Sequence, residues 1–214
     1  QMCIRDRGFA TKIYDSDENE IQTLSSAGAN RTYVTIDQIP KDLQHAFIAI
    51  EDERFYEHNG IDMRGILRAA SITLSSGEMS QGASTITQQL LKNNVFNAFN
   101  ESTIEKIKRK VQEQYLAIKL ETVMSKDSIL ENYLNTINLG NGYYGVQAAA
   151  RGYFNKDVSE LSISECAVIA SITKSPTGLN PIRHADRNKD RQSQVLVNMN
   201  CLLYTSPSPR DPKT

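Results

Sequence analysis

Helical periodicity is the feature that most constrains the fold of this chain. From Pro40 onward, apolar residues recur mainly at helical spacing, and little of that sequence alternates as a strand does. Capping-box pairs, in which Ser or Thr precedes Glu or Gln by three residues, indicate helix starts at Thr85, Ser102 and Ser162. Residues 37–200 are therefore predicted to form one mainly α-helical domain.

The individual helices follow from the same pattern. Pro40 suits a first helical position, and Asp62 can cap the helix that follows it. Further helices are expected near residues 85–93, 103–123, 126–136, 146–154, 163–172 and 186–199.

Residues 8–36 show extended patterns instead. Residues 11–14 and 20–24 flank a polar turn at 15–19, which predicts a hairpin, and the alternation in 31–36 predicts a third strand. Because so small a sheet is marginal alone, we interpret it as a β linker or pedestal that leans on another part of the protein.

The two ends of the chain resemble translated sequencing adapter. One short DNA sequence encodes residues 1–7, and its reverse complement encodes the start of residues 201–214. We expect both segments to be adapter artefacts and exclude them from the fold argument. Other codons in the nucleotide sequence would contradict this hypothesis.

Without those ends, Cys166 is the only cysteine, and its apolar helical setting predicts a buried small hydrophobe. Basic residues fall from 24 to 20 and acidic residues from 25 to 23, a net charge of about −3. This balance argues against a nucleic-acid partner, including a binding module built on the basic residues 106–110.

Polar clusters interrupt the helices in four places. In residues 51–60, Glu51 follows an apolar run, and a carboxylate beside an apolar wall loses hydration, which suits it to proton transfer. In residues 82–92, a small-residue loop opens into a helix and offers N–H groups and hydroxyls to a phosphate. A solvated helix end explains the first cluster equally well, and a plain helix cap explains the second.

The third cluster lies in the helix expected at 103–123. Arg109 and Glu113 are four residues apart, roughly opposite an apolar stripe, with Lys106 and Lys110 nearby. The stripe consists of Ile104, Ile107, Val111, Tyr115 and Ile118. The pair fits either a solvated helix face or a cationic wall that faces a cleft and keeps Glu113 charged.

The fourth cluster joins residues 126–135 to the loop 140–145. Three glycines interleaved with tyrosines indicate a loop of defined shape, or one that only packs against the domain.

In this order, the clusters resemble the family-51 glycosyltransferases, the glycan-polymerising domains of bifunctional penicillin-binding proteins and monofunctional transglycosylases. The resemblance covers roughly residues 35–200. The first motif is matched by Glu51, Asp52, Phe55, His58 and Gly60, the second by Gly82 to Gln89, the third by Arg109, Lys110 and Glu113, and the fourth by Lys126, Asp127, Ile129, Leu130, Glu131, Tyr133, Leu134 and Asn135. The stretch between Lys92 and Arg109 is a few residues longer than in many members.

The resemblance implies a lysozyme-like fold with two lobes around a cleft, and lipid II as the glycosyl acceptor. Glu51 would be the general base, with inversion at the anomeric carbon and release of undecaprenyl pyrophosphate. Glu113 would be the second carboxylate, which organises cations or Mg²⁺ around that pyrophosphate. Asp52 and His58 would mainly support Glu51, with Asp52 also near the substrate.

The same resemblance assigns the substrate-binding residues. The cations expected on the pyrophosphate are Lys92, Arg109, Lys110 and Lys174, and the groups expected on the sugar phosphate are Ser84, Thr85, Gln88 and Gln89. No protein-only metal site is expected.

Residues 61–79 carry more apolar surface than one cleft wall needs. The apolar residues are Met63, Ile66, Leu67, Ile72, Leu74 and Met79. By resemblance, this part lies in the bilayer interface as an interfacial helix. The expected location is the extracytoplasmic side of the cell membrane, with the growing glycan chain and division or elongation proteins as partners.

Two alternatives stay open. A lytic, lysozyme-like hydrolase needs a protonated acid but no cationic bed, and the Arg109–Glu113 cluster disfavours it. A non-catalytic scaffold would be expected to lose one carboxylate, and both are present. Whether a transpeptidase domain follows residue 200 stays open, although the pedestal favours a bifunctional parent.

Overall fold

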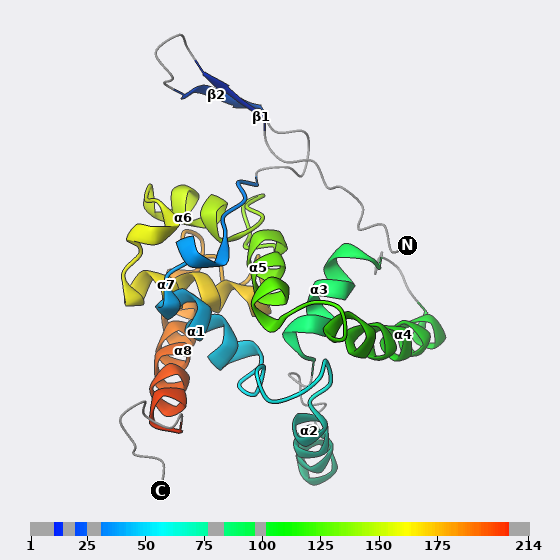
Figure 1. The fold of residues 1–214 in the computed structure, drawn as a ribbon. Helices are drawn as coiled ribbons and strands as arrows, with labels where there is room; N and C mark the ends of the chain where they lie inside the picture. The colour runs from blue at the N-terminus through cyan, green and yellow to red at the C-terminus, as the bar shows by residue number, and fades with distance from the viewer. Residues whose placement is uncertain (1–10, 15–19, 25–30, 77–83, 97–101, 206–214) are drawn as a thin grey trace, which may run out of the picture.

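The computed structural model describes residues 11–14, 20–24, 31–76, 84–96 and 102–205. It is mainly helical with one two-stranded sheet, which confirms the predicted fold class (Figure 1). The α-helices are α1 Lys41–Glu51, α2 Met63–Ser76, α3 Ile86–Asn94, α4 Thr103–Glu121, α5 Lys126–Thr136, α6 Val146–Phe154, α7 Ile163–Ser171 and α8 Ala185–Thr205. Short 3-10 turns are η1 Ile36–Gln38, η2 Val158–Glu160 and η3 Ile172–Lys174.

The predicted caps form as hydrogen bonds. The hydroxyl of Thr85 accepts the backbone N–H of Gln88 at 3.2 Å, and the boxes at Ser102 and Ser162 form in the same way. Asp62 Oδ1 accepts the N–H of Gly65 at 3.0 Å and so begins α2. Pro40 is the N-cap of α1 instead of its first helical residue, a shift of one position.

The N-terminal hairpin is confirmed, but its third strand is wrong. β1 (Thr11–Tyr14) pairs antiparallel with β2 (Glu20–Leu24), and the predicted turn at 15–19 lies outside the described residues. Residues 31–35 form no strand, and α5 instead satisfies the backbone of Val34. The amide side chain of Asn135 bonds the N–H and the carbonyl of Val34 at 2.9 and 2.8 Å.

The helices form two groups around the predicted cleft. Helices α1, α7 and α8 pack on one another, α3 packs on α4 and α5, and α5 also contacts α6. Phe47 and Tyr133 meet edge to face in the buried core, with ring centroids 6.0 Å apart. Cys166 is fully buried as predicted, and burial with the nearby Asp42 charge raises the pKa of its thiol to about 12.

Two helices project from this body. Figure 1 shows α2 directed away from the other helices and α4 extended to one side. Leu67 and Leu74 of α2 are 66% and 88% exposed, and the predicted interfacial residue Met79 lies outside the described residues. Among the described helices, none combines the length and apolar character needed to cross a bilayer.

Helix α8 continues to Thr205, beyond the helix end predicted at residue 199 and the domain end predicted at residue 200. A helix can extend into any segment of adequate propensity, so the adapter origin of residues 201–205 stays a prediction. Residues 1–7 and 206–214 lie outside the described residues.

Candidate active site

The cleft is a cavity of about 790 Å³ between the two helix groups. An adjoining hollow of about 220 Å³ shares Glu51 and Ser84 with it and reaches the base of α2. The predicted residues that line the cleft are Glu51, Ser84, Gln88, Gln89, Lys92, Lys110, Glu113 and Lys174. Asp52 and Thr85 line the hollow, and Arg109 contacts Glu113 without lining either cavity. The predicted site residues therefore gather in one place.

Glu51, the last residue of α1, is half-buried and held by neutral donors. The amide of Gln89 donates to its Oε2 at 2.8 Å, and the hydroxyl of Thr173 donates to its Oε1. The other end of the Gln89 amide accepts the hydroxyl of Tyr133 at 3.1 Å. Helices α3 and α5 and the turn η3 thus fix the carboxylate at the cleft wall.

Tyr133 keeps this arrangement in one protonation state. Its side chain is fully buried, and burial, with the charges of Glu51 and Asp52, raises the pKa of its phenol well above 10.0. The phenol therefore remains protonated near neutral pH and continues to donate to Gln89.

Asp52 and His58 position the end of α1. The Asp52 carboxylate is buried, accepts the N–H of Ile86 at 2.9 Å and lies 2.9 Å from His58 Nε2. Because His58 Nδ1 accepts the N–H of Gly60 at 3.2 Å, the ring hydrogen is on Nε2 and is donated to Asp52. Asp52 and His58 are hydrogen-bonded to each other, which fits the supporting role expected for both.

Gly60 explains the glycine of the first motif. Its φ is +88°, and a Cβ there would lie 2.6 Å from the backbone carbon of Ala117 in α4. Its carbonyl also accepts the hydroxyl of Thr85 at 2.8 Å. The loop after Glu51 therefore contacts α4 backbone to backbone.

Of the polar groups at the start of α3, some stabilise the helix and others lie beside the cleft. Thr85 and Gln88 are buried and form the capping box. Gln88 Nε2 is buried without a hydrogen-bond partner beside the cleft, and Ser84 accepts Lys110 Nζ at 2.8 Å. Ser84 and the Gln88 amide are the groups available to a ligand here, while Gly82 lies outside the described residues.

Helix α4 turns its charged side inward and its apolar side to solvent. Glu113 is fully buried, accepts a hydrogen bond from Arg109, and lies 3.0 Å from Lys110 Nζ in an ion pair without hydrogen-bond geometry. The apolar residues Ile104, Ile107, Val111, Tyr115 and Ile118 are between 46% and 67% exposed. The interpretation of a solvated Arg109–Glu113 pair is therefore wrong, and the cleft-wall interpretation describes the geometry.

The groups around Glu113 do not form a complete metal site by themselves. Glu113 Oε2 is buried and accepts no hydrogen bond, but Lys110 Nζ lies 3.0 Å from it, so a metal ion would have to displace that ammonium group. Across the described part of the chain, no group of three His, Cys, Asp or Glu side chains lies close enough to hold a metal. A Mg²⁺ ion here would need phosphate oxygens and water as its other ligands.

The cleft carries an excess of positive charge. Arg68, Lys92, Lys110, Lys174 and Arg191 line it, against the two carboxylates Glu51 and Glu113. Such a balance favours an anionic ligand with several charges.

Some lining residues were not predicted from the sequence. Arg191, Gln194 and Asn198 of α8 lie at i, i+3 and i+7, and this polar stripe was the available signal. Arg68 of α2 was also missed. It pairs with Glu53 at 2.9 Å, next to the ion pair of Arg54 with Asp62.

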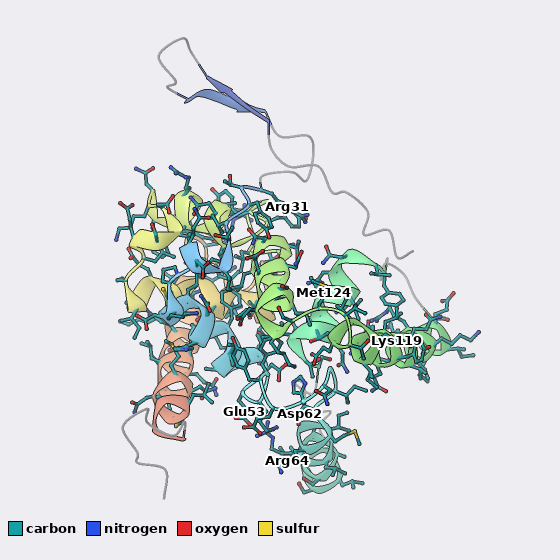
Figure 2. The ribbon with its side chains drawn as sticks, viewed as in Figure 1. Arg31, Glu53, Asp62, Arg64, Lys119 and Met124 are labelled. Atoms are coloured by element: carbon teal, nitrogen blue, oxygen red, sulfur yellow. The ribbon has the colours of Figure 1, made fainter. Side chains whose placement is uncertain are left out.

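Figure 2 shows Glu53 and Asp62 together at the base of α2, with Arg64 farther along the helix. Burial opposes ionisation of Asp62, but the hydrogen bonds from Arg54 and Gly65 outweigh it and hold the pKa of that carboxyl below its usual range. These pairs attach α2 to the rim of the cleft.

Residues of the fourth motif support the site through contacts outside the cleft. Lys126 Nζ lies 4.5 Å from the ring centroid of Phe55 and pairs with Glu121 at 2.7 Å. Glu131 accepts the N–H of Ile36 at 2.6 Å. The fourth motif therefore connects α5 to the first motif, through Phe55, and to the segment that precedes α1, through Ile36.

Known proteins with similar sequences are penicillin-binding proteins. Penicillin-binding protein 1F of Bacillus subtilis (strain 168) is 45% identical over 197 residues, which cover 92% of this chain and 27% of that protein. Penicillin-binding protein 1A of Escherichia coli (strain K12) is 48% identical over 188 residues, covering 88% and 21%. The chain thus spans about a quarter of the length of these relatives.

A crystal structure of penicillin-binding protein 1A from Haemophilus influenzae aligns with a TM-score of 0.48 and 25% sequence identity, over 93% of this chain and 19% of that one. The family model described as Transglycosylase matches residues 17–200. Since this match covers most of the chain, the chain belongs to the transglycosylase family, the family-51 glycosyltransferases whose motifs it carries.

Proposed function

We propose that this chain is a peptidoglycan glycosyltransferase that polymerises lipid II into glycan strands. The observation that carries the proposal is the arrangement of the two cleft carboxylates. Glu51 is held by neutral donors at the wall of a cleft whose other charged groups are mostly cations. This transfer requires a base next to cations that can bind an anionic leaving group.

In the proposed reaction, Glu51 takes the proton from the 4-hydroxyl of the lipid II acceptor. The hydroxyl oxygen attacks the anomeric carbon of the growing chain, from the face opposite the lipid pyrophosphate. The new C–O bond forms as the bond to the pyrophosphate oxygen breaks, and that oxygen leaves with the electron pair. Configuration inverts, as in inverting glycosidases with a sugar hydroxyl in place of water.

The leaving undecaprenyl pyrophosphate would bind to the cations of the cleft. Lys110, Lys92 and Lys174 reach it directly, while Arg109 holds Glu113 in place. A Mg²⁺ ion, if bound, would use the buried oxygen of Glu113 and would add positive charge beside the pyrophosphate. The Gln88 amide and the Ser84 hydroxyl are placed to hold sugar or phosphate oxygens.

A lytic enzyme has less support from this geometry. Cleavage of a glycosidic bond needs an acid that protonates the leaving sugar oxygen, and it gains nothing from five cations. The two reactions differ in product, because only polymerisation releases undecaprenyl pyrophosphate.

The test is polymerisation of fluorescent lipid II in detergent, followed by gel separation of the glycan products. Long glycan and released undecaprenyl pyrophosphate from the wild-type chain, both lost in Glu51→Gln, would support the proposal. Shortening of added glycan without consumption of lipid II would indicate the lytic enzyme instead. Folded protein that neither consumes lipid II nor binds a lipid II analogue would contradict the proposal.

The exposed side of α2 supports action at a membrane surface, and the family membership suggests the extracytoplasmic side, where the glycan grows. Leu67 and Leu74 are exposed, and the exposed arginines Arg64 and Arg68 lie on the same helix. The double change of Leu67→Glu and Leu74→Glu should reduce flotation with anionic liposomes. Unchanged flotation would remove this part of the proposal. Division or elongation proteins as membrane partners are proposed from the family resemblance alone.

A further inference from the structure

A second hollow, of about 230 Å³, lies beside the catalytic cleft and is not used by the proposed reaction. Its lining comes from the glycine-rich loop at 138–144 and from residues 176–183. Asn138 and Pro176 line both this hollow and the cleft, so the two are adjacent. A long ligand that leaves the cleft on this side would meet the hollow.

The walls of the hollow are held in one shape. Asn180 is buried, donates to the Asn141 side chain at 2.9 Å and accepts the N–H of Arg183 at 3.1 Å. Gly140 has a φ of +78°, and a Cβ there would lie 2.6 Å from the carbonyl oxygen of Pro176. Asn141 also has a positive φ, of +50°, an uncommon conformation that the surrounding contacts maintain. The loop thus forms a wall of fixed shape that is preorganised for a ligand.

The chemistry of the lining suits a carboxylate on a polar molecule. Among the described residues, no acidic side chain lines the hollow, and Arg183 is exposed and forms no ion pair with a carboxylate. Amide side chains, a threonine and the ring of Tyr144 complete the lining. The hollow is not lined by the three lysines proposed to bind the pyrophosphate, Lys92, Lys110 and Lys174, which we call the lysine bed. One arginine among neutral polar groups matches a single carboxylate better than a pyrophosphate.

We propose that this hollow is a subsite for a carboxylate of the peptide attached to the growing glycan strand, with Arg183 as its cation. The inference rests on the proposed function. In that reaction the pyrophosphate end of the strand occupies the lysine bed, and the strand leads away from it, past Asn138 and Pro176. A peptide branch on a sugar behind the reacting one would then reach Arg183. Binding there would keep the strand attached between successive additions.

Binding of lipid-free fragments tests the subsite without requiring turnover. The probes are short glycan–peptide fragments with free carboxylates, the same fragments with amidated carboxylates, and peptide-free glycan, measured by calorimetry. Wild type should bind the free carboxylate about tenfold more tightly than the amidated form. Arg183→Gln should lose this preference and Arg183→Lys should retain part of it. Arg187→Gln, an exposed change four residues later, in α8 and outside the hollow, should keep the preference in full.

Equal binding of the free and amidated fragments by wild type would overturn the inference, as would an unchanged preference in Arg183→Gln. Product length gives an independent readout. Arg183→Gln should make shorter glycan from lipid II while the first coupling of two lipid II molecules keeps its rate. Normal glycan length would contradict the subsite and leave the proposed function intact. A wild-type chain that makes no glycan would contradict the proposed function instead.

Discussion

The end of α1 and the middle of α4 each place one carboxylate in the same cleft, but in opposite surroundings. Glu51 is half-buried and accepts hydrogen bonds from an amide and a hydroxyl, both neutral. Glu113 is fully buried and is held by a guanidinium and an ammonium group. Glu113 compensates two cations, whereas the donors to Glu51 carry no charge. These surroundings support the proposed roles of Glu51 on α1 as the base and Glu113 on α4 as the charge-organising group.

The largest test of this comparison is to convert each carboxylate to its amide. Glu51→Gln should lower kcat by about 10³-fold, the scale of a lost general base, and change the free energy of unfolding by less than about 0.5 kcal/mol. Glu113→Gln should lower kcat by about 10²-fold and destabilise the fold by about 2 kcal/mol, because the largely buried Arg109 loses its charged partner. Lipid II kinetics and urea unfolding measure both. Equal losses of stability would remove the distinction between the two sites.

A smaller effect is expected when one cation of the α4 site is removed. Lys110→Met should lower kcat/KM by about tenfold, because Lys110 contacts Glu113 and Ser84 but is nearly half exposed. Lys106→Met, an exposed change on the same helix, is the matched control and should leave kcat/KM unchanged. Similar losses in both variants would mean that general charge, and not contact at the cleft, matters.

The smallest effect concerns the support behind Glu51. Tyr133→Phe removes the hydroxyl that orients Gln89, and should lower kcat about threefold and stability by about 1 kcal/mol. Since the folded-state pKa of Tyr133 is raised, its contribution to stability is complete below the unfolded value of 10.0 and is lost as pH rises through the folded value. The stability difference from wild type should thus stay constant between about pH 6 and pH 9 in urea titrations. A difference that disappears within that range would contradict the assigned hydrogen bond.

Local sequence signals predicted the helices because caps act within one turn. Thr85, Ser102 and Ser162 begin helices through contacts three residues away, which a sequence states directly. The prediction of a strand at 31–36 was wrong, and the backbone of Val34 instead bonds the side chain of Asn135, about a hundred residues later. No local pattern indicates that an amide side chain replaces a neighbouring strand.

The site residues likewise divide into those that the sequence predicted and those that only the tertiary structure reveals. The motifs identified Glu51 and Glu113, but the periodicity of α4 gave no way to decide which side is buried, and the apolar stripe proved to be exposed. Arg68 and Arg191 were missed because they reach the cleft from separate helices that only the tertiary structure brings together. Charge on a helix predicts a solvated face equally well as a cleft wall.

The contact at Gly60 links the two carboxylates mechanically. With no side chain at Gly60, the loop that follows Glu51 rests directly on the backbone of α4, one turn beyond Glu113. Close-packed backbones of this kind transmit a displacement instead of absorbing it. In the proposed reaction, a movement of α4 as the pyrophosphate departs would therefore be transmitted to Glu51 and would couple product release to resetting of the base.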